Sequence, residues 1–298
     1  MSSATKYYEN LEKNFVSWAQ SKEDIRAAFM VGSRARSDHP ADEWSDMDII
    51  LYTSKQDSYL SDAKWVENFG KVWTSVLSRT SGGEPECLTL FDGGWQVDFV
   101  FHTIDDLEQI VEKRAIPDNF NRGVKVLVDK DNIADKITPK CFKAPQGTTL
   151  SEKAFVQTAN MFWFLALYIA KQIMRNDLWM VKVRDTNMKE FLLQMIEWHE
   201  KVVNGSAYDT WHAGRFICEW ASPETRKELQ SAFGHFDRTD SWRALADTIA
   251  LFERLSHDIA QRKGFAYPYA LENNISDWIR QNAKGLGYRG YWRWQYCS

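Results

Sequence analysis

The sequence has 298 residues, of which 44% are hydrophobic and 26% are charged, and its formal net charge at pH 7 is -4. This length allows one large domain or two of ordinary size, with a sizeable core. The acidic balance gives no general electrostatic reason to bind DNA or RNA, so we expect no nucleic-acid partner. The four cysteines lie far apart and show neither zinc-site nor disulfide spacing, which fits a reducing cytoplasm.

No segment has the character of a membrane span or a signal sequence. Residues 1–15 lack an apolar signal core, and the longest apolar run, residues 161–170, is shorter than the roughly 20 residues that a spanning helix needs. We therefore expect a cytoplasmic protein that binds no membrane and is a monomer or a homodimer.

The first elements along the chain alternate between helix and strand. An apolar stripe at helical spacing predicts a helix over residues 6–20. Runs of β-forming residues predict strands over 25–31 and 47–53, separated by a polar loop. Large apolar residues recur at helical spacing over 62–77, which predicts a second helix packed on a sheet.

The next elements complete a mixed N-terminal half. Asp92-Gly93-Gly94 lies between the strand-like segments 87–91 and 95–101 and predicts a hairpin, because Asp-Gly readily supplies the positive φ of a tight turn. A helix over 105–114 and a strand over 124–129 follow. We expect an α+β fold whose sheet contains at least one antiparallel pair.

The pattern changes near residue 140, where prolines, a glycine and a capping-box pattern, Thr149 followed by Glu152, lie close together. We place a domain boundary there, which predicts domains of residues 1–140 and 141–298. The second domain should be an all-α helical bundle. Its helices are predicted over 152–175, 186–203, 223–233 and 240–262.

Three aspartates stand out in the N-terminal half. Asp46 and Asp48 open a strand-like segment, and their spacing of two places both side chains on one face. Asp98 lies on the face opposite to Val97 and Phe99, where an aspartate is costly unless it is paired or binds a metal. Carboxylates held close together favour a divalent cation with oxygen ligands between them.

A Gly-Ser pair, Gly32-Ser33, ends the strand upstream of these aspartates. Glycine lets a phosphate approach the backbone, and the serine hydroxyl can donate to phosphate oxygens. Each feature alone has an ordinary explanation as a turn, a cap or a solvent-facing strand residue. Their combination and order favour metal-assisted phosphoryl or nucleotidyl transfer.

Residues 32–49, GSRARSDHPADEWSDMDI, resemble the nucleotidyltransferase signature of the DNA polymerase β superfamily. The chain resembles the aminoglycoside 6-adenylyltransferases, the streptomycin-modifying enzymes, more closely. This similarity runs through VDFVF, RGVKVLVDKDN, FWFLALYIAKQIMRND and FLLQMIEW, and so covers nearly the whole chain. The resemblance implies an N-terminal nucleotidyltransferase domain with a mixed sheet, followed by a helical substrate-binding domain.

The resemblance also implies Mg²⁺-dependent transfer of AMP from ATP to a hydroxyl of a cationic aminoglycoside, with release of pyrophosphate. Asp185 would bind this acceptor or take its proton, although its segment is equally typical of a helix N-cap. The carboxylates expected to hold Mg²⁺ and to act in catalysis are Asp46, Asp48 and Asp98. The residues expected to contact the nucleotide are Gly32, Ser33, Arg34 and Lys182.

The sequence does not decide the identity of the acceptor, because the family typically has a Gly-Lys-rich segment where this chain has residues 204–220, with His212 and Arg215. A nucleotidyltransferase acting on another small-molecule or protein hydroxyl, as in toxin-type enzymes, is one alternative. A non-catalytic nucleotide-binding relative is another, and the three carboxylates argue against it. The aromatic and basic residues 287–298 admit nucleic-acid stacking, which the acidic chain disfavours.

Overall fold

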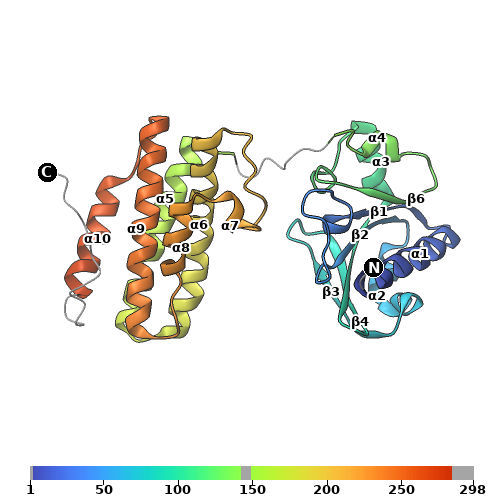
Figure 1. Ribbon diagram of the computed structural model, residues 1–298, viewed down its shortest axis with the longest axis horizontal. Coiled ribbons are helices and arrows are strands. Elements are labelled where there is room, and N and C mark those ends of the chain that lie inside the picture. Colours follow the sequence, from blue (N-terminus) through green and yellow to red (C-terminus); the bar gives the residue numbers. More distant parts are fainter. Residues whose placement is uncertain (1–2, 142–148, 284–298) are drawn as a thin grey trace. The chain divides into compact units, whose positions relative to one another are not determined.

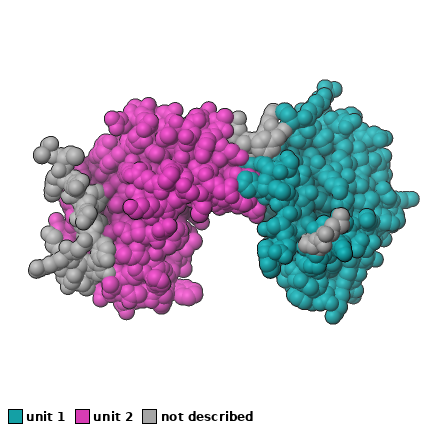
Figure 2. Space-filling view, in the orientation of Figure 1, with its two compact units in different colours: residues 1–145 teal, residues 146–298 magenta. Residues whose placement is uncertain are grey.

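The computed structural model describes residues 3–141 and 149–283 (Figure 1). The chain divides into two compact units, residues 1–145 and 146–298, shown in different colours in Figure 2. The first unit contains a mixed sheet with helices, and the second contains helices. The predicted α+β class is therefore confirmed. The functional roles of the two domains that we predicted, with their boundary at residue 140, stay predictions, and residues 287–298 lie outside the described residues.

Six strands form one sheet in the order β3-β4-β5-β2-β1-β6. Neighbouring strands are antiparallel except for β2 and β5, which run parallel. This parallel pairing places Asp48 directly beside Asp98. The strands are β1 (Ile25–Val31), β2 (Met47–Thr53), β3 (Val72–Arg79), β4 (Pro85–Phe91), β5 (Trp95–His102) and β6 (Lys125–Asp129).

Helices cover both faces of the sheet and bury a separate core on each. On one face, helix α1 (Ser3–Ser21) and the 3₁₀ helix η2 (Ala63–Phe69) pack on Phe99 and its apolar neighbours. On the other face, α3 (Ile104–Lys113) and α4 (Ala134–Ile137) enclose a second core. Because side chains alternate along β5, Val97, Phe99 and Phe101 enter the first core, whereas Asp98 lies on the opposite face with Val100, which packs against the second core.

Several predicted elements of this unit are confirmed. The first helix and the strands over 25–31 and 47–53 form as expected. The hairpin also forms, and its turn contains Gly93 at φ 94° and Gly94 at φ 80°, a backbone region that favours glycine. The helix predicted over 105–114 is α3.

The prediction of one helix over 62–77 is wrong. The 3₁₀ helix η2 ends at Phe69, and after Gly70 the chain forms the edge strand β3. Trp73 and Val76, which that helix would have buried, are 57% and 51% exposed. The apolar residues that suggested one helix belong partly to η2 and partly to β3. In β3, the β-branched residues Val72, Thr74 and Val76 stand at alternate positions, and this pattern favours a strand.

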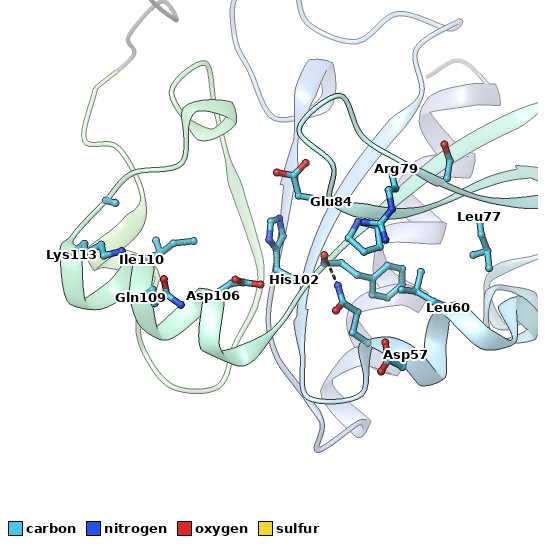
Figure 3. A pocket seen from close by; sticks show the side chains of 15 residues that line it. Asp57, Leu60, Leu77, Arg79, Glu84, His102, Asp106, Gln109, Ile110 and Lys113 are labelled. Carbon is cyan, nitrogen blue, oxygen red and sulfur yellow. Dashed lines mark hydrogen bonds between the residues drawn. The ribbon is translucent and has the colours of Figure 1, made fainter.

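A hollow of about 1060 Å³ lies in this unit at the far end of β5 (Figure 3). It is lined by residues of β3, β4 and α3 and by α2 (Gln56–Ser61). Figure 3 shows His102 with Glu84 and Asp106 nearby, and burial lowers the pKa of this imidazole. None of the site residues predicted from the sequence lines this hollow, so it is separate from the carboxylates.

The second unit is a bundle around three long helices: α5 (Glu152–Met174), α6 (Leu178–Asn204) and α9 (Arg238–Lys263). The shorter helices α7 (Ile217–Trp220), α8 (Pro223–Ala232) and α10 (Tyr269–Ala283) complete it. Its core is aromatic, with the rings of Phe162 and Phe252 stacked at 3.6 Å. None of the helices in the described ranges is both long enough and apolar enough to cross a membrane.

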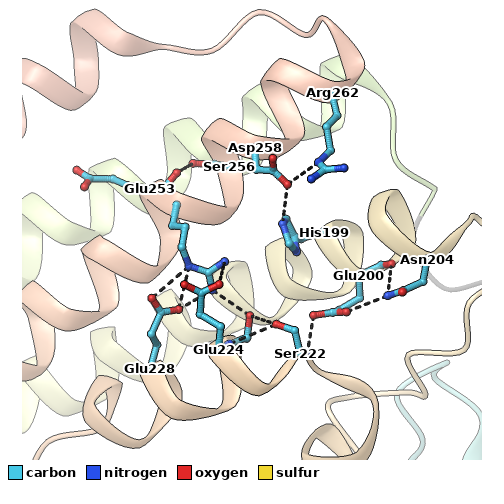
Figure 4. Close-up of polar contacts among 12 residues, drawn as sticks. His199, Glu200, Asn204, Ser222, Glu224, Glu228, Glu253, Ser256, Asp258 and Arg262 are labelled. Atoms are coloured by element: carbon cyan, nitrogen blue, oxygen red, sulfur yellow. Dashed lines mark hydrogen bonds and ion pairs between the residues drawn. The ribbon is translucent and has the colours of Figure 1, made fainter. Parts of the chain in front are cut away.

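Polar contacts also join the helices of this bundle (Figure 4). His199 on α6 lies 2.9 Å from a carboxylate oxygen of Asp258 on α9. The buried Glu200 accepts a hydrogen bond of 2.8 Å from the backbone N–H of Ser222, just before α8. Since an unpaired buried carboxylate is costly, these contacts help to specify how α6, α8 and α9 pack.

Two helix caps in the bundle differ from the sequence prediction. Helix α6 begins at Leu178 with Asp177 as its N-cap, well before the predicted start at 186. Asp185 therefore lies inside the helix, and its interpretation as an N-cap is wrong. The cap of α5 is Ser151, whose side chain accepts from the backbone N–H of the residue three positions later, so the cap predicted at Thr149 is also wrong.

Candidate functional site

The three predicted carboxylates meet where β2 and β5 begin to pair. Asp48 and Asp98 are neighbours in the parallel register, and Asp46 lies just before β2 rather than inside it. One oxygen from each of the three side chains lies within 4.8 Å of the others. Within the described ranges, no other three His, Cys, Asp or Glu side chains meet this spacing.

Gly32 is fixed by its contact with one of these carboxylates. It follows β1 with φ +72°, and a Cβ built on it would lie 2.1 Å from Oδ2 of Asp48. Both the left-handed backbone and this close approach require glycine. Ser33 comes next, and its Oγ is buried without a hydrogen-bond partner among the described residues. This hydroxyl is therefore available to a ligand of the site.

The guanidinium of Arg34 donates hydrogen bonds to the backbone of the segment before β2. Its Nε donates to the carbonyl of Asp46 at 2.8 Å, and a terminal nitrogen donates to the carbonyl of Ser45 at 2.7 Å. The guanidinium carbon also lies 3.5 Å from the centre of the Tyr8 ring. Arg34 thus holds the segment that leads into β2, and its predicted contact with a phosphate stays a prediction.

Asp98 lies in a partly buried, electronegative environment. Burial raises the pKa of this carboxyl to about 6, and the charges of Asp46 and Glu86 act in the same direction. The amide of Gln96 opposes them, because its Nε2 donates to both carboxylate oxygens, at 3.0 and 3.2 Å. A nearby cation would relieve the repulsion among these groups.

The donor set fits a hard divalent cation such as Mg²⁺. Carboxylate oxygens are the ligands that this class of metal prefers, and three of them converge here from two strands and a loop. A metal held at this position would lie beside the Gly32-Ser33 turn. The arrangement is therefore suited to chemistry on a phosphate group.

Metal binding at this site should depend on pH. Asp98 is expected to take up a proton as the pH falls through about 6, and the protonated carboxyl competes with the metal. We expect the affinity for Mn²⁺, a spectroscopic substitute for Mg²⁺, to fall about tenfold per pH unit below that value. Titrations followed by electron paramagnetic resonance between about pH 5 and pH 8 measure this. Equal affinities at both ends of the range would contradict the role of Asp98.

The other two predicted residues, Lys182 and Asp185, lie on α6 of the second unit. Lys182 donates to the carbonyl of Gly234 at 3.0 Å and to Oγ of Ser241 at 3.1 Å. Asp185 forms an ion pair of 2.6 Å with Lys189, and both side chains are largely buried. Their predicted roles in nucleotide and acceptor binding stay predictions, and these contacts tie both side chains into the bundle.

Sequence reasoning missed one residue that contacts the groups around the site. Tyr8 on α1 is 4% exposed, and its hydroxyl exchanges hydrogen bonds with the backbone of Gln96. Tyr8 shares a helix face with Leu11 and Phe15, so its burial was readable from the apolar period. No pattern in the sequence marked its hydroxyl, because its partner lies 88 positions away.

Comparisons with known proteins show which family the whole sequence resembles. The sequence model of the family described as streptomycin adenylyltransferase matches residues 5–282. Aminoglycoside 6-adenylyltransferase of Bacillus subtilis (strain 168) is 27% identical over 268 residues, covering 85% of this chain and 90% of the relative. The protein of that name from Campylobacter jejuni is 24% identical over 288 residues, covering 91% and 94%.

The crystal structure of an aminoglycoside 6-adenyltransferase from Bacillus subtilis is 20% identical, covers 92% of this chain and 97% of that one, and has a TM-score of 0.44. The family match by itself spans most of the sequence, so the resemblance predicted from the motifs is confirmed. The chain therefore belongs to the streptomycin adenylyltransferase family of nucleotidyltransferase enzymes.

Proposed function

We propose that this protein transfers AMP from Mg-ATP to a hydroxyl of a streptomycin-like aminoglycoside and releases pyrophosphate. The observation that carries the proposal is the cluster of three carboxylate oxygens within 4.8 Å, beside a glycine turn whose serine hydroxyl has no hydrogen-bond partner in the described part of the chain. The acceptor class is supported by the names of the relatives, which are aminoglycoside 6-adenylyltransferases.

In the proposed reaction, the acceptor oxygen forms a bond to the α-phosphorus of ATP. The bond from that phosphorus to the bridging oxygen breaks, and pyrophosphate leaves with its electron pair. Mg²⁺ held by Asp46, Asp48 and Asp98 would neutralise charge on the phosphates. Ser33 would donate its hydroxyl hydrogen to a phosphate oxygen, and the rigid strands would hold the carboxylates in place.

The hydroxyl proton of the acceptor needs a base, and the sequence left Asp98 and Asp185 as candidates. Asp98 lies in the carboxylate cluster, where the acceptor hydroxyl would meet the α-phosphate in the proposed reaction. Asp185 already shares its charge with Lys189. We therefore assign the proton to Asp98 or to water beside it.

A cationic acceptor fits the charge on this face of the sheet. Alternation along β4 and β5 places Glu86 on the same face as Asp98, and its negative charge helps to raise the pKa of Asp98. Such a concentration of negative charge attracts ammonium groups. If Asp185 also binds the acceptor, an ammonium group must compete there with Lys189.

The proposal is tested by incubating the protein with Mg-ATP and, separately, streptomycin and a panel of other aminoglycosides. We expect mass spectrometry to show one aminoglycoside gaining one adenylyl group, with release of one pyrophosphate. The Asp98→Asn protein is the control for contaminating activity. Absence of any modified aminoglycoside, together with adenylylation of another small molecule or a protein, would overturn the acceptor and favour the alternative enzyme.

A further inference from the structure

The hydroxyl of Tyr8, on helix α1, forms hydrogen bonds with the backbone near the start of β5. It donates to the carbonyl of Gln96 at 3.1 Å and accepts from the N–H of the same residue at 3.1 Å. The pairing of β5 with β2 begins one residue later, at Val97 and Met47. The tyrosine on α1 therefore fixes the backbone of β5 just before the parallel pairing starts.

The residue whose backbone Tyr8 binds, Gln96, also orients Asp98 through its side-chain amide. Gln96 and Asp98 share one face of β5 because side chains alternate along a strand. The Gln96 amide donates to both oxygens of Asp98, at 3.0 and 3.2 Å. A change in the position of Gln96 would therefore change the direction of the carboxylate.

The ring of Tyr8 also affects the position of Asp46, through its contact with Arg34. The guanidinium of Arg34 lies over it at 3.5 Å and donates to the backbone carbonyls of Ser45 and Asp46. A guanidinium on an aromatic face is held by cation–π attraction. The ring thus supports the arginine that fixes the backbone of Asp46, while the hydroxyl supports the amide that directs Asp98.

We propose that Tyr8 is a positioning residue for divalent metal binding, which sets the relative geometry of Asp46 and Asp98 through Arg34 and Gln96. The inference rests on the proposed metal-dependent function. It makes helix α1, which contributes no carboxylate to the cluster, a determinant of metal affinity. Tyr8 touches no reacting atom in this assignment.

The test measures Mn²⁺ binding to the full chain without ATP or acceptor, by electron paramagnetic resonance and by calorimetry. Tyr8→Phe keeps the ring and removes both hydrogen bonds, so we expect the affinity to fall about 5- to 10-fold. Tyr8→Leu also removes the cation–π support, and the affinity should fall further. In the Gln96→Leu background, Tyr8→Phe should have little additional effect, because the two residues act through one path.

The matched control is the adjacent Tyr7. Its hydroxyl is buried without a hydrogen-bond partner among the described residues, so Tyr7→Phe should keep the wild-type Mn²⁺ affinity. The turnover of Tyr8→Phe should recover as Mg²⁺ is raised, which a general loss of packing would not produce. Wild-type Mn²⁺ affinity in Tyr8→Phe, with only a lower melting temperature, would overturn the inference.

Failure of the proposed function gives a different result. If the wild-type protein binds Mn²⁺ and Tyr8→Phe binds it more weakly, the inference stands even when no aminoglycoside is adenylylated. If the wild-type protein binds no Mn²⁺, both the metal site and the role of Tyr8 are wrong. If adenylylation occurs and the affinity is unchanged in Tyr8→Phe, only the role of Tyr8 is wrong.

Discussion

Asp98→Asn is expected to lower the rate of adenylyl transfer about a thousandfold, because it removes the negative charge of one of the three carboxylates proposed to hold the metal. The amide side chain has nearly the same size and can still accept one hydrogen bond from Gln96, so the local fold should persist. Initial rates of pyrophosphate release with Mg-ATP and the modified aminoglycoside measure the effect. A loss below tenfold would show that Asp98 is not part of the catalytic centre.

The control for this substitution is Asp105→Asn. Asp105 is exposed in the first turn of α3, and this substitution removes the same negative charge away from the site, so the rate should stay at the wild-type value.

Thermal stability provides a second check on Asp98→Asn. The raised pKa of Asp98 means that its ionisation opposes folding of the metal-free protein as the pH rises through about 6. At neutral pH without metal, Asp98→Asn should therefore melt no lower than the wild-type protein.

Gly32→Ala should abolish metal-dependent activity by a different route, with a loss of at least about a hundredfold. The new Cβ would lie 2.1 Å from Oδ2 of Asp48, so the carboxylate must move away from the cluster. The left-handed φ of +72° adds roughly 1–2 kcal/mol of backbone strain for alanine. Pyrophosphate release and Mn²⁺ affinity should both fall.

Gly264→Ala separates the two causes. Gly264 ends α9 with φ +67°, and a Cβ there meets no atom within 4 Å, so only the backbone strain is reproduced. We expect this variant to lose stability and to keep the turnover of the folded protein. If Gly32→Ala behaves in the same way, the contact between Gly32 and Asp48 does not control the site.

The main features of the site followed from local patterns in the sequence. The period of two along a strand predicted that Asp98 would lie on the face opposite to Val97 and Phe99, as observed. The Gly-Ser turn and Asp-x-Asp motif predicted which segments would meet. These patterns succeed because they depend only on the backbone geometry of a few consecutive residues, and the order of those residues is known from the sequence.

The features that the sequence did not reveal depend on distant or competing contacts. The hydroxyl of Tyr8 has a partner only because α1 packs against β5. Apolar spacing over 62–77 could not show that the chain changes from η2 to β3 after Gly70. Helix α10, over 269–283, was also missed. The start of α6 was placed too late because aspartate is a favourable cap at either position, and the helix begins after the first of them, Asp177.

The parallel pairing of β2 with β5 determines which changes of chain length the site can survive. Asp48 and Asp98 are partners at one rung of this pairing. Deleting Met47, or inserting one residue between Met47 and Asp48, would shift the register by one and direct the Asp48 carboxylate towards the apolar core. Substitutions on neighbouring strands leave this register intact, whereas a one-residue insertion or deletion within β2 or β5 should separate the two carboxylates.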